Sequence, residues 1–199
     1  MGKKKVEKLY NANTALTAAD AFRVQSKVFI DSLPKGNLDE AAQFAIHNLG
    51  GLIASATTLA LALELYLKAL RIVTGFPASE VHHLWSLYKH LPTELKKVIE
   101  TQYNQLNIPQ VGKLAVLELE VSTEPFNNIS DENEGKSNNL SNDIKSVLIR
   151  SSDAFITWRY IHEGAKKGEY VKYDYEFYRL ELICDITRTH LTTILQTKS

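Results

Sequence analysis

The most apolar stretch of the chain constrains its fold more than any other feature. It runs for about fourteen residues from Gly50 until Glu64 interrupts it. A membrane-spanning helix requires roughly 20 apolar residues, so this stretch is too short to be one. It lies in an Ala- and Leu-rich region, about 38–73, which predicts one long helix buried in a core. Gly50 and Gly51 predict a kink or a point of close packing, and Gly75 predicts the end of the helix.

Apolar residues at helical spacing predict several further helices. They span about 17–33, 80–91, 93–106, 143–163 and 175–195. Thr17 and Asp20 have the spacing of a capping box, and Ser79 is the expected N-cap of the second of these helices. Helices joined by short connections form bundles. We therefore expect an all-α helical bundle in a single domain over 1–199.

Two segments depart from the helical pattern. Leu117–Val121 alternates as a strand does, but no second strand signal is present to pair with it. We therefore interpret it as a helix or an extended connection. Residues 125–142 are rich in Asn, Ser, Asp, Glu and Gly and poor in apolar side chains, which predicts a flexible surface loop.

The charge balance and the single cysteine bear on location and partners. Lys plus Arg and Asp plus Glu number 23 each, so no whole-chain field attracts nucleic acid or an anionic membrane. Any contact with RNA must therefore be a local patch. Cys184 lies in an apolar pattern typical of a buried thiol, and Lys3–Lys5 is not followed by the apolar stretch of a secretory signal. We expect a cytoplasmic protein that does not associate with a membrane.

Three segments of the sequence, taken in their order along the chain, form a recognisable pattern. They are Leu59–Leu70 with Gly75 shortly after it, His82–Tyr88, and Asp153–Glu163. Together they resemble the HEPN family. The first is similar to the long central helix of that family, the second to its His-x-Leu-x-x-Leu helix, and the third to the aromatic-Arg-Tyr segment of one subgroup. The resemblance covers about 40–195, which is most of the chain.

The resemblance implies an antiparallel four-helix core and a homodimer. It also implies a place in prokaryotic toxin–antitoxin or antiphage defence systems, in which a protein encoded nearby can be a partner. Many HEPN proteins are ribonucleases that use neither a metal nor a cofactor, and others bind without catalysis. We therefore expect an RNA-directed effector. The alternative is a non-catalytic helical module for dimerisation, interaction or nucleotide binding.

Catalytic HEPN proteins carry an Arg followed after four to six residues by a His. Here Arg159 precedes His162 by two intervening residues, which departs from that spacing. The candidate roles are phosphate stabilisation for Arg159 and proton transfer for His162, with Tyr160 as a binding residue. The alternative is that Arg159 pairs with Glu163 and His162 is a hydrogen-bonded histidine at the edge of the core.

A polar stripe runs along the long apolar helix. It consists of Thr57, Glu64, Lys68 and Arg71. Glu64 and Lys68 have the spacing of an intrahelical ion pair, which is one interpretation of the stripe. In the other, the stripe lines a cleft in which Glu64 and His83 support catalysis. The residues that would then bind RNA or a nucleotide are Lys68, Arg71 and His82.

The two adjacent histidines have a simpler interpretation as well. His82 or His83 could form a tertiary hydrogen bond to a neighbouring helix. Adjacent side chains point about 100° apart on a helix, so the pair is a poor set of metal ligands and no metal site is expected.

An aromatic run near the last helix is the best candidate for contact with bases. Its aromatic residues lie between 170 and 178 and are interleaved with lysine and arginine. Lys172 and Tyr173 are the binding candidates in this run. Asp174 and Glu176 dilute its positive charge, which favours the alternative of core packing together with a dimer interface.

Overall fold

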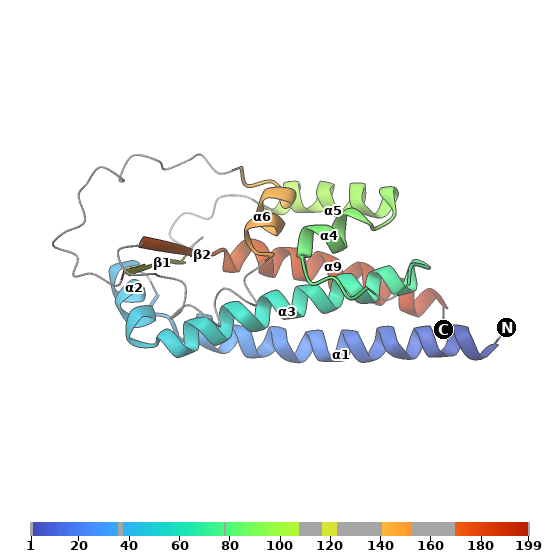
Figure 1. Cartoon of the computed structure of the whole chain (residues 1–199), viewed down its shortest axis with the longest axis horizontal. Coiled ribbons are helices and arrows are strands. Elements are labelled where there is room, and N and C mark those ends of the chain that lie inside the picture. Colours follow the sequence, from blue (N-terminus) through green and yellow to red (C-terminus); the bar gives the residue numbers. More distant parts are fainter. Residues whose placement is uncertain are drawn as a thin grey trace.

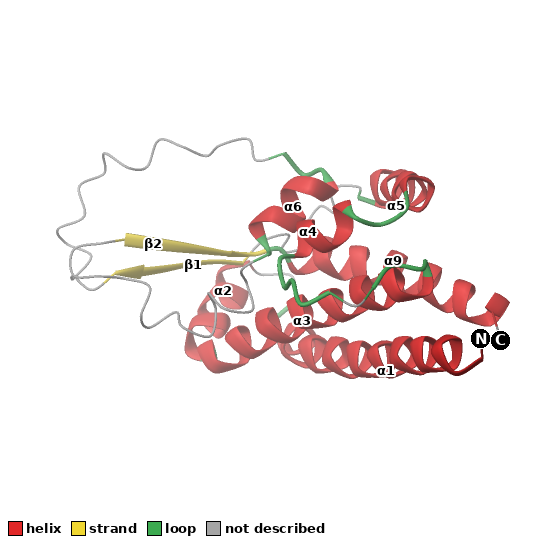
Figure 2. Cartoon of the chain, turned by 45° about the vertical axis from the view of Figure 1, so that its right-hand side comes forward, coloured by secondary structure: helices red, strands yellow, loops and turns green. Residues whose placement is uncertain are grey.

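The computed structural model describes residues 2–35, 38–77, 79–107, 117–122, 141–152 and 170–198. Within these ranges the chain forms seven helices and one two-stranded ribbon (Figure 1, Figure 2). The helices are α1 (Gly2–Ser32), α2 (Leu38–His47), α3 (Leu49–Val73), α4 (Leu84–Lys89), α5 (Thr93–Leu106), α6 (Ile144–Arg150) and α9 (Phe177–Lys198). The strands are β1 (Leu117–Ser122) and β2 (Tyr170–Tyr175). The predicted all-α helical bundle is confirmed.

Three long helices, α1, α3 and α9, lie side by side and form the body of the protein (Figure 1). Asp20 of α1 pairs with Arg188 of α9, whereas Arg23 pairs with Glu181, so α1 and α9 run in opposite directions. Figure 1 shows that α3 also runs opposite to α1, and therefore in the same direction as α9. The short helices α4, α5 and α6 cover the side of the bundle away from α1.

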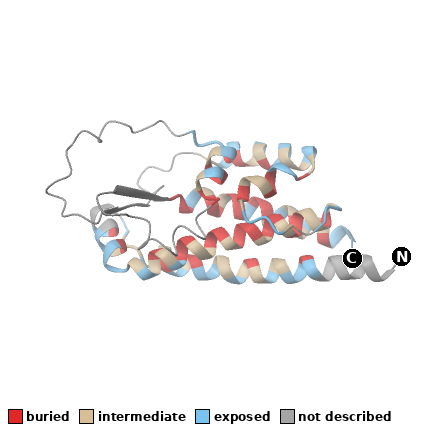
Figure 3. Cartoon of the chain, in the orientation of Figure 1, coloured by how far each residue is buried: buried red, intermediate tan, exposed pale blue. Residues whose placement is uncertain are grey.

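The spacing of buried residues in α3 explains why this helix forms the core. Along one face they alternate in steps of four and three, as in a helix packed over its whole length. These residues are Leu52, Ala56, Leu59, Leu63, Tyr66, Leu70 and Val73. The small buried residues Ala12, Ala19 and Ser26 recur every seven positions on α1. Figure 3 shows the buried residues concentrated along α3, so the predicted core helix is confirmed.

By length and composition, α3 is also the one described helix that could cross a membrane. Half of its most apolar stretch is buried inside the protein. The core helix of a folded domain has the same composition, so this property by itself assigns no location.

The predicted helix over 38–73 is divided into α2 and α3. Asn48 separates them with a non-helical backbone, and its side-chain amide donates to the Phe44 carbonyl at 2.9 Å. This polar side chain, rather than the adjacent glycines, marks the break. Close packing at Gly51 is confirmed, because a Cβ atom there would lie 2.7 Å from Cδ2 of Phe29.

The predicted end of α3 at Gly75 is confirmed. Gly75 has a φ of +95°, a conformation that a residue with a Cβ atom rarely adopts. Its N–H donates to the Ile72 carbonyl at 3.1 Å, and the Phe76 N–H donates to the Arg71 carbonyl at 2.9 Å. These two bonds form a Schellman motif, which fixes Phe76 directly beyond the helix.

The predicted start of the first helix at Thr17 is wrong, because α1 begins at Gly2. Thr17 donates its hydroxyl proton to the Asn13 carbonyl one turn earlier, as a threonine inside a helix does. Asp20 does not close a capping box and instead bonds to Arg188 and Tyr66. Tertiary packing of the preceding turn, including buried Ala12, outweighs the local capping signal.

Other helix boundaries agree with the sequence to differing degrees. Helix α5 has the predicted bounds. Helix α4 is shorter than predicted, because His83 rather than Ser79 is its N-cap. Asp143 caps α6 by accepting from the Ser146 N–H at 2.9 Å. The helix then ends at Arg150, short of the predicted 163, and residues 153–163 lie outside the described residues.

The ribbon corrects the interpretation of Leu117–Val121. This segment is strand β1, and it pairs antiparallel with β2, with Leu117 opposite Tyr175 and Ser122 opposite Tyr170. The sequence Tyr170–Tyr175 supplies the second strand, which its β-branched and aromatic residues favour. Most of the predicted loop over 125–142 lies outside the described residues.

Candidate functional site

A buried carboxylate of α3 forms the centre of the candidate site. Glu64 is 4% exposed, and its Oε1 lies 2.8 Å from Lys68 Nζ and 2.9 Å from His82 Nδ1. The intrahelical ion pair predicted from the spacing is therefore confirmed. The stripe also meets a histidine, as the second interpretation expects, and that histidine is His82. The catalytic role that this interpretation gives to Glu64 stays a prediction.

The His82 ring is oriented by this contact and exposed to solvent. Its side chain is 65% exposed, whereas that of Glu64 is 5% exposed. An ionised carboxylate can only accept a hydrogen bond, so Nδ1 carries the proton and donates to Glu64. In the neutral form of the ring, Nε2 then holds a lone pair on the exposed side chain. A neutral imidazole held in one tautomer by a carboxylate can act as a general base.

His83 has a structural role instead. Its Nδ1 accepts from the Ser86 N–H at 3.3 Å, which caps α4, and lies 3.0 Å from the Ser152 hydroxyl. The Ser152 hydroxyl also lies 2.5 Å from the Leu148 carbonyl of α6, so its one proton is shared between these two acceptors. His83 therefore ties α4 to the end of α6, which confirms the tertiary hydrogen bond proposed for one of the two histidines.

Arg71 continues the polar stripe one turn beyond Lys68. Its Nε is buried, and among the described residues it has no hydrogen-bond partner and its guanidinium pairs with no acidic side chain. The guanidinium lies 5.6 Å from the centre of the Phe76 ring. Thr57 lies about 10 Å from Glu64 along the helix axis, at 1.5 Å per residue. Its hydroxyl is buried and finds no hydrogen-bond partner within the described ranges either.

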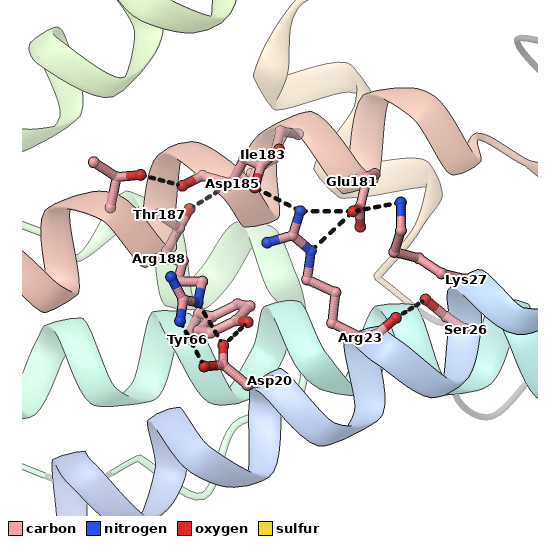
Figure 4. Close-up of polar contacts among 11 residues, drawn as sticks. Asp20, Arg23, Ser26, Lys27, Tyr66, Glu181, Ile183, Asp185, Thr187 and Arg188 are labelled. Carbon is pink, nitrogen blue, oxygen red and sulfur yellow. Dashed lines mark hydrogen bonds and ion pairs between the residues drawn. The ribbon is translucent and has the colours of Figure 1, made fainter.

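A second polar cluster joins α1 to α9, and Figure 4 shows that its charges pair with one another. Arg188 binds both oxygens of Asp20 at 2.7 and 2.9 Å, and Tyr66 donates to the same carboxylate. Arg23 contacts Glu181 at 2.6 Å and Asp185 at 2.5 Å. Because these cations and carboxylates neutralise one another, we interpret the cluster as a link between helices.

Ionisation in this cluster follows from the same contacts. Burial disfavours the charged form of Asp20, but hydrogen bonds from Arg188 and Tyr66 outweigh it, so the pKa of the Asp20 carboxyl lies below its usual value. Burial also opposes the charge on Arg23, and the hydrogen bond to Glu181 outweighs it and raises the pKa of the guanidinium. Both groups therefore stay ionised across the neutral range.

Arg188 and His190 also lie close together in the sequence, as Arg159 and His162 do, but their side chains do not share a site. Arg188 faces α1 through Asp20, whereas Nε2 of His190 bonds to Oε1 of Gln102 in α5 at 3.0 Å. Burial lowers the pKa of the His190 imidazole, which favours its neutral form. The two side chains serve separate contacts between helices.

The aromatic run before α9 is partly described. Tyr175 and Phe177 are buried, and the Tyr175 hydroxyl lies 2.9 Å from the Ser55 hydroxyl of α3, which favours core packing for these two residues. Lys172 and Tyr173 lie in β2, and their side chains lie outside the described residues.

The structure brings together three of the predicted residues, Glu64, Lys68 and His82, with Arg71 on the same stripe. The predicted residues Arg159, Tyr160 and His162 lie outside the described residues. Sequence reasoning missed Phe76, although its place after the helix-ending Gly75 was a usable signal. It also missed Ser152, which no local pattern distinguishes.

Comparison with known protein families, with curated proteins and with solved structures found no match to this chain. The resemblance to HEPN proteins therefore rests on the three ordered segments of the sequence alone.

Proposed function

We propose that this chain is a HEPN-like, cytoplasmic effector that cleaves single-stranded RNA without a metal ion, in a prokaryotic defence or toxin–antitoxin system. The observation that carries the proposal is the exposed imidazole of His82, held through Nδ1 by the buried Glu64 carboxylate. The three HEPN-like segments and the helical bundle support it. The site uses chemistry that a protein can supply with side chains alone.

In the proposed reaction His82 is the general base. Nε2 takes the proton of a ribose 2′-hydroxyl, the 2′-oxygen forms a bond to the adjacent phosphorus, and the bond from phosphorus to the 5′-oxygen breaks. The products are a 2′,3′-cyclic phosphate and a 5′-hydroxyl, once the leaving oxygen receives a proton. Lys68 lies beside the same carboxylate and supplies positive charge near the reacting ring.

Arg159 and His162 remain part of the proposal. Arg159 would stabilise the phosphate charge, and His162 would return the proton to the leaving 5′-oxygen. The family resemblance also carries the proposal of a homodimer, in which the two sites share one groove. A chain that stays monomeric at high micromolar concentration in light scattering would contradict the shared groove.

A second candidate, a non-catalytic interaction module, has one observation of its own. Val24 and Val28 lie one turn apart on the outer face of α1 and are 65% and 60% exposed. Exposed β-branched side chains at this spacing are typical of a helix that packs against a partner.

The two candidates are separated by an RNA cleavage assay in the presence of EDTA. We expect the protein to cleave single-stranded RNA, and the His82→Ala variant to be slower by roughly 10²- to 10⁴-fold, the usual contribution of a general base. His90→Ala is the matched control, because His90 bonds only to the Ser86 carbonyl of its own helix among the described residues. Intact RNA after incubation with the wild-type protein would favour the interaction module.

Further variants assign the partners of His82. Glu64→Gln keeps the shape of the side chain but no longer fixes the ring through an anion, and we expect a smaller loss than for His82→Ala. The double variant Arg159→Ala and His162→Ala should lose activity without a change in melting temperature. Activity equal to that of the wild type in this double variant would remove both residues from the mechanism.

A further inference from the structure

We propose that Arg71 and Phe76 form a nucleotide subsite for single-stranded RNA, in which the guanidinium binds a phosphate and the Phe76 ring stacks on the adjoining base. The inference rests on the proposed function for the class of ligand. It concerns binding beside the reacting centre, so it can fail or hold separately from the cleavage chemistry.

Arg71 is a cation without an anionic partner in the part of the chain that the structure describes. There its buried Nε donates to no atom, and its guanidinium has no carboxylate partner. The other described arginines, which are Arg23, Arg150, Arg179 and Arg188, each pair with at least one carboxylate. A partly buried guanidinium without an anion is unfavourable unless a ligand supplies one. A phosphate matches the planar fork of donors that Arg71 offers.

The Schellman motif fixes the backbone of Phe76, because the Phe76 N–H donates to the Arg71 carbonyl at 2.9 Å. The side chain is 37% exposed, so one part of the ring is open to solvent while the guanidinium lies 5.6 Å from its centre. An exposed aromatic ring beside an arginine is the usual platform for a base in proteins that bind single strands.

Positive side chains gather where the polar stripe reaches the end of α3. Lys198 donates to the Val73 carbonyl at the end of α3, and Lys68 lies one turn before Arg71. Glu64 is held by Lys68 and His82. In the sequence from 65 to 92, Glu80 is the only acidic residue, and it is exposed. The end of α3 is therefore a local positive patch on a chain without net charge.

The spacing along the stripe sets the length of the ligand. Glu64 and Arg71 are separated by about 10 Å along the helix, at 1.5 Å per residue. His82 contacts Glu64, so the reacting ring and the Arg71 guanidinium lie at different points along one stripe. One phosphate cannot occupy both points, whereas a strand with several nucleotides can.

The test measures binding without cleavage. A fluorescently labelled 2′-O-methyl oligouridylate of eight nucleotides lacks the 2′-hydroxyl nucleophile, so its affinity is measured by anisotropy independently of catalysis. We expect Phe76→Leu to weaken binding by roughly 5- to 150-fold, the equivalent of the 1–3 kcal/mol that stacking one base contributes. We expect Arg71→Ala to weaken binding by at least roughly tenfold, and Arg71→Lys to restore only part of the loss because it lacks the planar fork.

Control measurements separate this subsite from general attraction. Lys97→Ala removes an exposed lysine of α5 that pairs with Glu94, and its affinity should equal that of the wild type. An abasic strand of the same length should bind the wild type and Phe76→Leu equally. Affinities of Arg71→Ala and Phe76→Leu equal to the wild type, with unchanged melting temperatures, would overturn the inference. Competition by inorganic polyphosphate as strong as that by the oligonucleotide would overturn the stacking role of Phe76.

Measuring both binding and cleavage separates the subsite from the proposed function. Wild-type protein that binds the 2′-O-methyl strand through Arg71 and Phe76 but leaves unmodified RNA intact would refute cleavage and retain the subsite. Cleavage of RNA that survives in both variants with unchanged affinity would retain the function and refute the subsite.

Discussion

Gly51 and Gly50 form a pair of neighbouring positions at which one methyl group should have opposite effects. Both lie in the first turn of α3, where alanine is favoured over glycine by at most about 1 kcal/mol. Apart from its chain neighbours and the local helix backbone, a Cβ atom at Gly50 would have no described atom within 4 Å, whereas a Cβ atom at Gly51 would lie 2.7 Å from Cδ2 and 3.2 Å from Cε2 of Phe29. Phe29 is 8% exposed and belongs to the core, so its ring has little room to move.

The expected magnitude follows from these contacts. Overpacking a core position costs about 1–3 kcal/mol, so the free energy of unfolding of Gly51→Ala should lie about that much below that of Gly50→Ala. In a domain of this size each kcal/mol lowers the melting temperature by about 2–4 °C. Gly50→Ala itself should match or slightly exceed the wild type.

Urea denaturation monitored by circular dichroism measures the difference, since both variants should keep the wild-type slope. A double-mutant cycle with Phe29→Leu then tests the cause, because a smaller side chain should recover most of the loss at Gly51. Equal stability of Gly51→Ala and Gly50→Ala would refute the close approach of α1 and α3 at this point.

Three further predictions test the packing and the ionic links of the bundle. Leu63→Ala should destabilise the protein by about 2–5 kcal/mol in urea, because Leu63 is fully buried, and a loss under 1 kcal/mol would contradict its place in the core. Cys184 is fully buried, and burial raises the pKa of its thiol, so a thiol reagent should label it only as fast as the protein opens. Immediate labelling of the native protein would contradict this burial. Asp20→Asn removes the carboxylate bound by Arg188, whose side chain is 42% exposed, and should cost about 1 kcal/mol near pH 7. Since the folded pKa of Asp20 is lowered, the wild-type advantage should persist above about pH 5 and vanish as the pH falls through the folded pKa, and an advantage that grows in acid would contradict the ion pair.

The helices that could be predicted from the sequence are those whose packing faces have a clear period. Helix α5 and the end of α3 at Gly75 are examples, since a turn signal and an apolar face agree there. The start of α1 could not be predicted, because its first turns contain few large apolar residues that would show a helical period. The ribbon was missed because its strands lie more than 40 residues apart in the chain.

In the candidate site too, the contacts within one helix could be predicted from the sequence and those between distant segments could not. The Glu64 and Lys68 pair follows from local spacing on one helix. The contact between Glu64 and His82 depends on how the segment after Gly75 returns along α3. The sequence therefore predicted a histidine beside Glu64 only as one of two alternatives. That Arg71 has no acidic partner among the described residues could not be predicted at all, because it depends on every helix around the side chain.

The central claim is that His82, oriented by Glu64, is the base for cleavage of RNA by its own 2′-hydroxyl. The most direct measurement is a single-turnover reaction in EDTA with an end-labelled single-stranded RNA, and with the same RNA carrying 2′-O-methyl groups. We expect 2′,3′-cyclic phosphate products from the unmodified strand and none from the modified strand. The cleavage rate should fall roughly 10²- to 10⁴-fold in His82→Ala. No cleavage by the wild type, or equal rates for wild type and His82→Ala, would contradict it.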